Sequence, residues 1–396
     1  MKKLLGLGWV LLLLAGAWLW PDPAGAIPAF ARKYNFNCIV CHTNYPRLND
    51  FGEAFRRNGY QLPGGEAEEK TILESPPPFS VRINVGYDND HFRHTPGAEN
   101  VNTFEVEGID LLSGGLLYKN IGYYALYPPQ VNASRGVAGQ DGTVEFANAI
   151  FSNLAKTWLN LRAGRLEPAN TGFSVSRMLT FSPYEIYEFT YPGGFPMGDP
   201  QTGIEVTGYG HGFNYAAGFV DGSDTNKMSD APQDLYARIS QVIGKGEGQT
   251  AGQRIGIIAY HGEARPDPSL PTGAQRIFNR YGADLSLNVK KVNLSVQYLI
   301  GQDNKYLWGL NQNVNFSGGF AELTAVPIGR LVLLARFDWV DTPASVSMDT
   351  TRETVAARYY IKDHLALHGE FSHRQQEQPG PYAIEDMLTG RLDFAF

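Results

Sequence analysis

Apolar and polar residues alternate at every second position in several stretches between residue 79 and the end of the chain. The final stretch shows the pattern most clearly, with two opposite faces: Leu388, Gly390, Leu392, Phe394 and Phe396 against Thr389, Arg391, Asp393 and Ala395. The same period recurs in residues 79–88, 281–289 and 330–340. A period of two residues predicts β-strands with one apolar and one polar face.

The segments that join these strands differ in length in a regular way. Tight turns are expected near residues 210–212, 289–291, 326–329 and 362–363. Long polar loops are expected near residues 221–232, 263–275, 302–313, 341–350 and 374–386. Short turns that alternate with long loops are typical of antiparallel β-barrels in bacterial outer membranes.

Counting the hairpins predicts about sixteen strands, with both chain ends on the periplasmic side. We therefore expect a mainly β fold, in which residues 79–396 form a transmembrane antiparallel β-barrel surrounded by outer-membrane lipid. A large soluble β-domain is the alternative, because the strands of a soluble sandwich alternate in the same way.

One of the long loops differs from the others in composition. Residues 166–200 are rich in aromatic side chains, among them Phe173, Phe181, Tyr184, Tyr187, Phe189, Tyr191 and Phe195. A disordered surface loop would contain few aromatic residues. We expect this loop to fold into the barrel and narrow its lumen, as the third loop of porins does.

The N-terminus has the pattern of a secretory signal. Lys2 and Lys3 precede an apolar run, and Ala24-Gly25-Ala26 follows as a small-residue cleavage site. The most apolar part of the run is shorter than the roughly 20 residues that a membrane-spanning helix needs. Residues 1–26 are therefore predicted to be a signal peptide, which is removed after export.

The next two segments are a small helical domain and a linker. In residues 27–60, Leu48, Phe51 and Phe55 recur at helical spacing, with Asn49 or Asp50 as N-cap and Gly59 as the stop. Residues 61–78 are rich in proline, glycine and acidic side chains, which is typical of a linker.

The chain has only two cysteines, and both belong to one short motif. Cys38-Ile39-Val40-Cys41-His42 has the C-x-x-C-H spacing of covalent c-type haem attachment. The two thiols bond to the porphyrin, and the adjacent histidine reaches the iron. A thioredoxin-like redox pair is the alternative, but no βαβ pattern surrounds the motif. We predict one covalent haem c, bound by Cys38, Cys41 and His42.

The sequence leaves the second axial ligand of the iron open. Residues 27–60 contain no methionine, and His42 is their only histidine. The iron is then five-coordinate, or is bound by a local oxygen or amine donor, or takes a ligand from the barrel. His368 is the first barrel candidate, because with His364 and Glu370 it faces the expected lumen; Met178, in the aromatic loop, is the second. The alternative for His368 is a hydrogen bond to inward-facing charges.

The N-terminal motifs resemble those of a known family. They are Pro28-Ala29-Phe30-Ala31-Arg32, the Cys38–His42 motif, Pro46-Arg47-Leu48, Phe51-Gly52 and Asn58-Gly59-Tyr60. Together they resemble the fused outer-membrane monohaem cytochrome c–porins of iron-oxidising bacteria. The resemblance implies a haem that accepts electrons from extracellular Fe(II), or from another donor, and passes them to a periplasmic cytochrome c. The protein would be an enzyme only as an iron(II):cytochrome c oxidoreductase.

Other functions remain open at this point. The barrel could be a diffusion porin with the haem domain as a plug or redox gate, in which the inward arginines Arg82, Arg336, Arg358 and Arg391 tune anion passage. The protein could also be a haem sensor or a small-molecule haem enzyme, or a conduit that sends electrons outward. An Fe(II) access site could use Asp88, Asp90, His91 and His94, since carboxylates and imidazoles bind iron.

Two classes of function are not expected. Because the formal net charge is −7, a nucleic-acid partner is not predicted. The sequence also contains no recognisable catalytic triad, phosphate-binding loop, dinucleotide fingerprint or zinc-ligand spacing.

Overall fold

The structure, a computed structural model, describes most of the chain. The described residues are 29–34, 36, 40–44, 47–62, 78–94, 97–129, 142–169, 171–191, 195–222, 234–244, 253–264, 276–304, 313–362, 364–377 and 383–396. The predicted signal peptide and most of the predicted linker lie outside these ranges.

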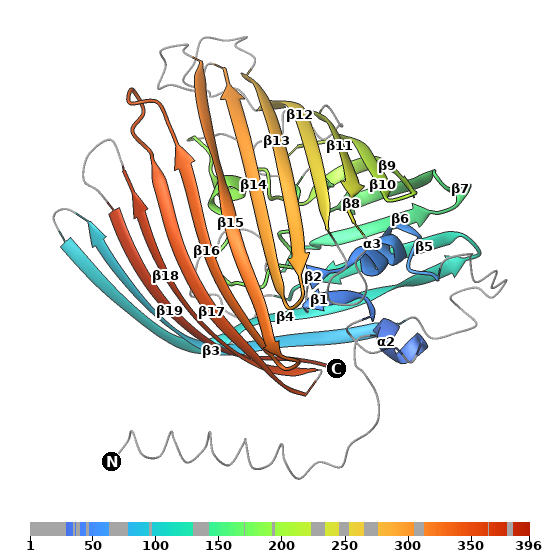
Figure 1. The fold of residues 1–396 in the computed structure, drawn as a ribbon, viewed down its shortest axis with the longest axis horizontal. Helices are drawn as coiled ribbons and strands as arrows, with labels where there is room; N and C mark the ends of the chain where they lie inside the picture. The colour runs from blue at the N-terminus through green and yellow to red at the C-terminus, as the bar shows by residue number, and fades with distance from the viewer. Residues whose placement is uncertain are drawn as a thin grey trace.

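The chain forms a closed antiparallel β-barrel of sixteen strands (Figure 1). These are all the strands that follow, except the short β7: β3 (Phe79–His94), β4 (Gly97–Tyr118), β5 (Ile121–Tyr127), β6 (Phe146–Phe151), β7 (Leu154–Thr157), β8 (Asn160–Leu166), β9 (Gln201–Gly210), β10 (Phe213–Val220), β11 (Asp234–Val242), β12 (Arg254–Ala264), β13 (Arg276–Val289), β14 (Val292–Asp303), β15 (Val314–Ile328), β16 (Leu331–Asp341), β17 (Thr350–Lys362), β18 (Leu365–Gln376) and β19 (Ala383–Ala395). The pairing of β19 with β3 closes the barrel. The prediction of a mainly β fold, with an antiparallel barrel of about sixteen strands, is confirmed.

The period of two in the sequence sets which side chains face the lumen. On β19, Thr389, Arg391 and Asp393 are buried, while Leu388 is half exposed on the outer face. The other strands that showed the pattern follow it too, so that charged and polar groups line the inside.

The two ends of the barrel differ as the sequence predicted. One end, which we call the turn end, carries tight hairpins such as the connection between β9 and β10. There His211 and Gly212 both have positive φ, at 52° and 77°, as a two-residue hairpin turn requires. The opposite end, the loop end, carries the long connections.

The described residues between 166 and 200, which we call the constriction loop, fold inside the barrel as predicted. Most of the loop's aromatic side chains are buried in one cluster with aromatic residues of the barrel wall (Phe173, Tyr184, Tyr187, Phe189, Tyr191 and Phe195 with Tyr236, Tyr260, Phe278, Phe316 and Phe320). Tyr184 stacks on Phe320 with ring centroids 4.1 Å apart, and Phe195 on Phe278 at 4.4 Å. The loop includes the short helix α4 (Glu185–Glu188).

Buried charges of the wall hold the constriction loop as well. Arg336 donates to the carbonyl oxygens of Ser182 and Pro183 at 2.8 and 2.7 Å. Glu370, on β18, accepts the backbone N–H groups of Phe181 and Ser182 at 2.8 and 2.7 Å. Each charge gains hydrogen bonds that compensate for its burial, and the loop backbone gains partners.

Replacing Tyr187 by alanine should loosen the constriction loop. Tyr187 is fully buried, accepts the N–H groups of Gly172 and Phe173, and donates to Gln297. The loss of the ring should cost about 3–5 kcal/mol. Unfolding in detergent and protease cleavage within residues 166–200 would measure the effect. Phe219→Ala, which removes an exposed aromatic side chain from β10, is the control; equal protease resistance of the two variants would contradict the prediction.

Candidate functional site

The described residues between 29 and 62, which we call the N-terminal segment, lie in the lumen at the turn end (Figure 1). The segment contains α2 (Ala29–Tyr34), β1 (His42–Asn44), β2 (Arg47–Leu48) and α3 (Asp50–Arg57). Asn49 caps α3 as expected, because its side-chain oxygen accepts the N–H of Gly52 at 2.9 Å. Gly59, at φ 71°, follows the end of the helix. No helix among the described residues is long and apolar enough to cross a bilayer.

The core of the N-terminal segment is shared with the barrel wall. Phe55 and Tyr60 of the segment are buried together with Ile150 of β6. Tyr60 stacks on Phe30 at 5.0 Å and on Tyr124 of β5 at 5.5 Å. The segment is too small to bury a sufficient core alone, so the wall completes it.

Polar contacts and one close backbone approach fix the segment's position. Gln61 donates to the hydroxyl of Ser152 at 2.7 Å. Arg47 forms an ion pair with Glu322, a fully buried carboxylate of β15. A Cβ atom on Gly122 of β5 would lie 2.3 Å from the carbonyl oxygen of Gly59, so the approach requires glycine.

Cys41 and His42 line a cavity between the N-terminal segment and the wall, the turn-end cavity. It encloses about 1420 Å³ of empty space, part of which is open to solvent. Its lining is largely apolar and aromatic: Phe30, Tyr34, Phe36, Leu48, Phe55 and Tyr60 from the segment, and Pro78, Leu112, Tyr124 and Leu126 from the barrel. Arg56, Arg82 and Arg177 add positive charge to this lining.

The backbone around the motif is closely packed against α3. Asn49 donates its side-chain amide to the carbonyl oxygen of Val40 at 3.0 Å, and its backbone N–H to that of Cys41 at 2.9 Å. A Cβ atom on Gly52 would lie 2.1 Å from the same Cys41 oxygen. These contacts hold Cys41 and His42 at the cavity, whereas Cys38 lies outside the described residues.

The residues present fit a haem. The cavity is large, mostly apolar and lined by His42, which matches a flat apolar macrocycle with an imidazole ligand. The guanidinium groups of Arg56, Arg82 and Arg177 suit the propionate carboxylates, because arginine–carboxylate hydrogen bonds are charge-assisted.

The two barrel candidates for the distal ligand do not line this cavity. His368 faces the lumen as predicted, but its Nε2 lies 3.0 Å from a carboxylate oxygen of Glu370, and its ring packs against Phe181. Met178 packs against the aromatic cluster of the constriction loop. Among the described residues of the lining there is no methionine and no histidine other than His42.

The residues considered for an Fe(II) access site do not come together. Asp88 and Asp90 are buried on the inner face of β3, and Asp88 accepts hydrogen bonds from Thr389 and Arg391. His91 is the next residue along the strand after Asp90, so it faces outward. The side chain of His94 is not described. Across the described ranges, no group of three or more His, Cys, Asp or Glu side chains could hold a metal ion.

The four predicted lumenal arginines face inward, and each is paired with a carboxylate. Arg82 and Arg358 bind Asp393, Arg336 binds Asp338, and Arg391 binds Asp88. The charges of Arg336, Arg358 and Arg391 are therefore largely compensated within the wall, whereas Arg82 also lines the turn-end cavity.

Sequence reasoning missed a second group of arginines. They line a chamber of about 1290 Å³ between the N-terminal segment and the constriction loop, which we call the arginine chamber: Arg47, Arg56, Arg57, Arg162, Arg177, Arg238 and Arg254. These residues come from the segment, the loop and three strands. The alternation of residues along the strands could have predicted that Arg162, Arg238 and Arg254 face the lumen. The sequence does not show that the N-terminal segment and the constriction loop lie against these arginines.

The charges of the chamber influence one another. Burial alone would raise the pKa of Glu167, but the cations of Arg177 and Arg56 and the hydrogen bonds from Ser174 and Ser176 lower it to about 2. Glu167 therefore remains ionised, and it binds Arg177 at 2.6 Å.

Comparison with solved structures places the barrel among porin-like folds. The anion-selective porin of Comamonas acidovorans has a TM-score of 0.60 at 11% identity, covering 80% of this chain and 99% of that porin. The outer membrane channel DcaP of Acinetobacter baumannii has a TM-score of 0.56 at 11% identity, covering 81% and 97%. The trimer form of OmpT of Vibrio cholerae has 0.52 at 9% identity, covering 80% and 99%. At these identities the likeness shows the fold alone.

No protein-family model matches the sequence, and no curated protein matches it. The chain is therefore a closed sixteen-stranded barrel of the porin kind, whose lumen contains the constriction loop and the N-terminal segment.

Gly52→Ala should displace α3 from the Cys41–His42 backbone. The added methyl group overlaps the Cys41 carbonyl, and overpacking of this kind costs about 1–3 kcal/mol. We expect faster protease cleavage within residues 29–62, because α3 no longer packs closely on this backbone. Gly369→Ala is the matched control, because a Cβ there meets nothing within 4 Å. The same protease resistance in both variants would refute the close packing.

Proposed function

We propose that this is an outer-membrane electron-transfer protein with one covalent haem c in the turn-end cavity. Cys38 and Cys41 would bind the haem, and His42 would be the proximal iron ligand. In this proposal the haem accepts electrons from extracellular Fe(II), or from another extracellular donor, and passes them to a periplasmic cytochrome c. The observation that carries the proposal is that Cys41 and His42 line a large apolar cavity inside the barrel.

The outer face of the barrel supports a membrane location. Large apolar side chains are exposed around it, including Ile204, Phe219, Leu235, Ile239, Ile257, Ile300, Leu323, Leu333, Phe337, Val355, Phe371 and Leu388. A soluble protein rarely exposes so large an apolar surface, whereas lipid covers it in a membrane barrel. The solved structures with this fold include outer membrane proteins.

The position of the cavity suits electron transfer across the membrane. The apolar band of such barrels is about 25 Å tall, so a single redox centre must lie within the barrel to reach both sides. A bound haem supplies reversible one-electron transfer at its iron. The residues of this chain have the remaining tasks: His42 would bind the iron, the aromatic lining excludes water, and Arg56, Arg82 and Arg177 would balance the propionates.

Anaerobic mixing of the purified, oxidised protein with Fe(II) at neutral pH tests this function. The reduced-haem absorption band should appear rapidly in the wild type and be lost in His42→Ala. His91→Ala, which alters a histidine on the outer face of β3, should behave as the wild type.

The other outcomes of this experiment are informative. If no haem band is present, the haem assignment is wrong. If the haem is present but stays oxidised, Fe(II) is not the donor, and the result points instead to another extracellular donor, a gated porin, a haem sensor or outward electron flow.

The second candidate is a diffusion porin in which the N-terminal segment is a plug or redox gate. The porin-like fold and the arginine chamber favour this function, because lumenal cations select anions. The solved structures of this fold include an anion-selective porin.

Conductance in planar lipid bilayers separates the two candidates. With the N-terminal segment in the lumen, the wild type should conduct poorly, and deletion of residues 27–62 should raise the conductance several-fold. The enlarged current should favour anions, and the replacement of Arg238 by glutamine should reduce this preference. Lys290→Gln, at an exposed turn, is the control. A high conductance in the wild type would support the porin and contradict a sealed electron conduit.

A further inference from the structure

The arginine chamber contains more positive than negative charge where α3 faces the barrel wall. Arg56 and Arg57 of α3 share one carboxylate, Glu53, at 2.9 and 3.6 Å. Across the chamber, Arg238 and Arg254 share Asp284, at 2.8 and 3.4 Å.

Four guanidinium groups therefore face two carboxylates, an excess of two positive charges. If Asp50, which also lines the chamber, is included, one positive charge remains. A buried excess of charge is unfavourable unless a counter-ion is present.

The same chamber contains hydrogen-bond donors without an acceptor among the described residues. The Nε groups of Arg162, Arg177 and Arg238 have none, although these atoms are buried. Arg238 is 9% exposed, so bulk water does not readily compensate. A buried donor without a partner costs about 1–3 kcal/mol, and an oxygen-rich anion supplies several acceptors at once.

The electrostatic state of Arg57 agrees with this geometry. Its burial lowers its pKa, as do the cations of Arg56, Arg238 and Arg254, and the pKa falls to about 10 although Glu53 opposes the shift. The guanidinium of Arg57 donates to Asn214 on β10, so it lies against the wall. An anion between Arg57 and the wall would attract Arg57 and the wall arginines Arg238 and Arg254, and so offset the repulsion between these cations.

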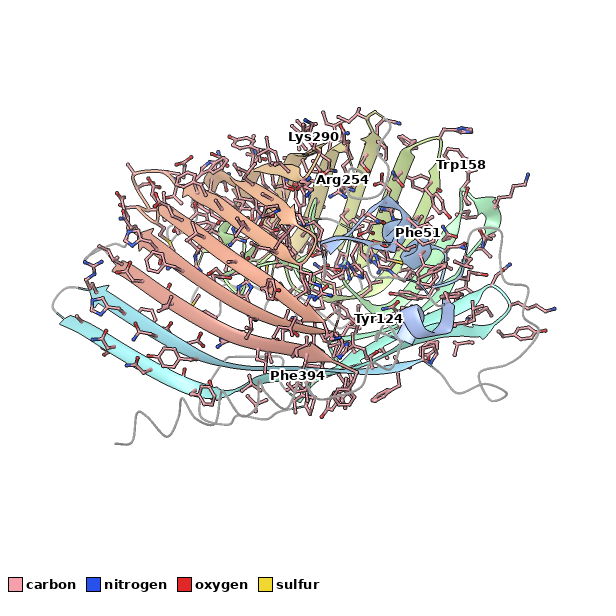
Figure 2. The ribbon with its side chains drawn as sticks, turned by 60° about the horizontal axis from the view of Figure 1, so that its bottom comes forward. Phe51, Tyr124, Trp158, Arg254, Lys290 and Phe394 are labelled. Atoms are coloured by element: carbon pink, nitrogen blue, oxygen red, sulfur yellow. The ribbon has the colours of Figure 1, made fainter. Side chains whose placement is uncertain are left out.

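An access route from the turn end reaches the same arginines. A second, smaller cavity contains Arg57 and Arg254 in its lining together with the hairpin residues His211 and Gly212. Figure 2 labels Arg254 on the barrel wall and Phe51 on α3. A small solute from the turn end would thus reach the chamber past α3.

We propose that the arginine chamber is a binding site for one small divalent oxyanion of the sulfate or phosphate class. The anion would bridge Arg57 of the N-terminal segment and Arg238 and Arg254 of the wall. It would thereby hold the segment in the lumen. This inference does not require a haem, because the arginines and carboxylates that carry it belong to the chain.

The competing occupant is a haem propionate. Arg56 and Arg177 line both the chamber and the turn-end cavity. A propionate that extends past these two arginines would fill the chamber and exclude a free anion. The experiment must therefore distinguish a bound propionate from a bound free anion.

Calorimetric titration of sulfate into the full-length, haem-loaded protein in detergent tests the proposal. The titration is made in chloride buffer at constant ionic strength. We expect one saturable site, with a dissociation constant that rises at least tenfold in Arg57→Gln and in Arg254→Gln. Arg93→Gln, at an exposed arginine of the loop end, is the matched control and should bind as the wild type. Arg57→Lys retains the positive charge and should bind sulfate better than Arg57→Gln. The comparison of these two variants separates an effect of the charge from an effect on folding.

Three results would overturn the proposal. They are the absence of saturable sulfate binding to the wild type, equal binding by the wild type and both glutamine variants, and binding only by the haem-free Cys38→Ala/Cys41→Ala protein. The last result would assign the chamber to the propionates. The absorption spectrum reports haem content separately, so a failure of the haem assignment is not confused with a failure of the anion site.

Discussion

The structure depends on one constraint: charges that face the inside of the barrel must find partners there. Alternation along each strand places groups such as Glu322, Arg336 and Glu370 in a lumen where they are almost completely buried. The wall provides some partners, as Asp338 does for Arg336. Others come from elsewhere in the chain, since Glu322 binds Arg47 of the N-terminal segment, and Glu370 binds the backbone of the constriction loop. The N-terminal segment and the constriction loop are thus stabilised inside the barrel in two ways. They pair with buried charges of the wall, and they bury their own apolar side chains.

The candidate site follows from this arrangement. The N-terminal segment has too few residues to form an independent core, and its aromatic side chains pack on Tyr124 and Ile150 of the wall. The cavity beside Cys41 and His42 therefore exists only where the segment and the barrel meet. In the same way, the constriction loop is stable inside because aromatic wall residues such as Phe320 and Phe278 replace the polar residues that usually line a barrel.

The sequence was informative where the signal is local. A period of two residues predicts both a strand and its inward face, and therefore the orientation of His368 and Arg391 was correct. The same rule would have separated His91 from Asp88 and Asp90, because neighbouring strand residues face opposite sides. What the sequence does not show is pairing over long separations. The partner of Arg47 lies on β15, and the arginines of the chamber come from distant parts of the chain. For His368, the sequence offered a hydrogen bond to an inward-facing charge as the alternative to iron ligation, and the contact with Glu370 agrees with this alternative.

Arg56 and Arg177 connect the two cavities of the lumen. Both residues line the cavity that fits a haem and the chamber that has an excess of positive charge. Coulomb interactions between partly buried charges a few ångströms apart amount to several kcal/mol at an effective dielectric constant of about 20. An anion in the chamber would therefore weaken the positive field at the cavity, and this field favours the reduced, less positive state of an iron centre. Anion binding and electron transfer would in this way be coupled through two arginines, without any movement of the barrel.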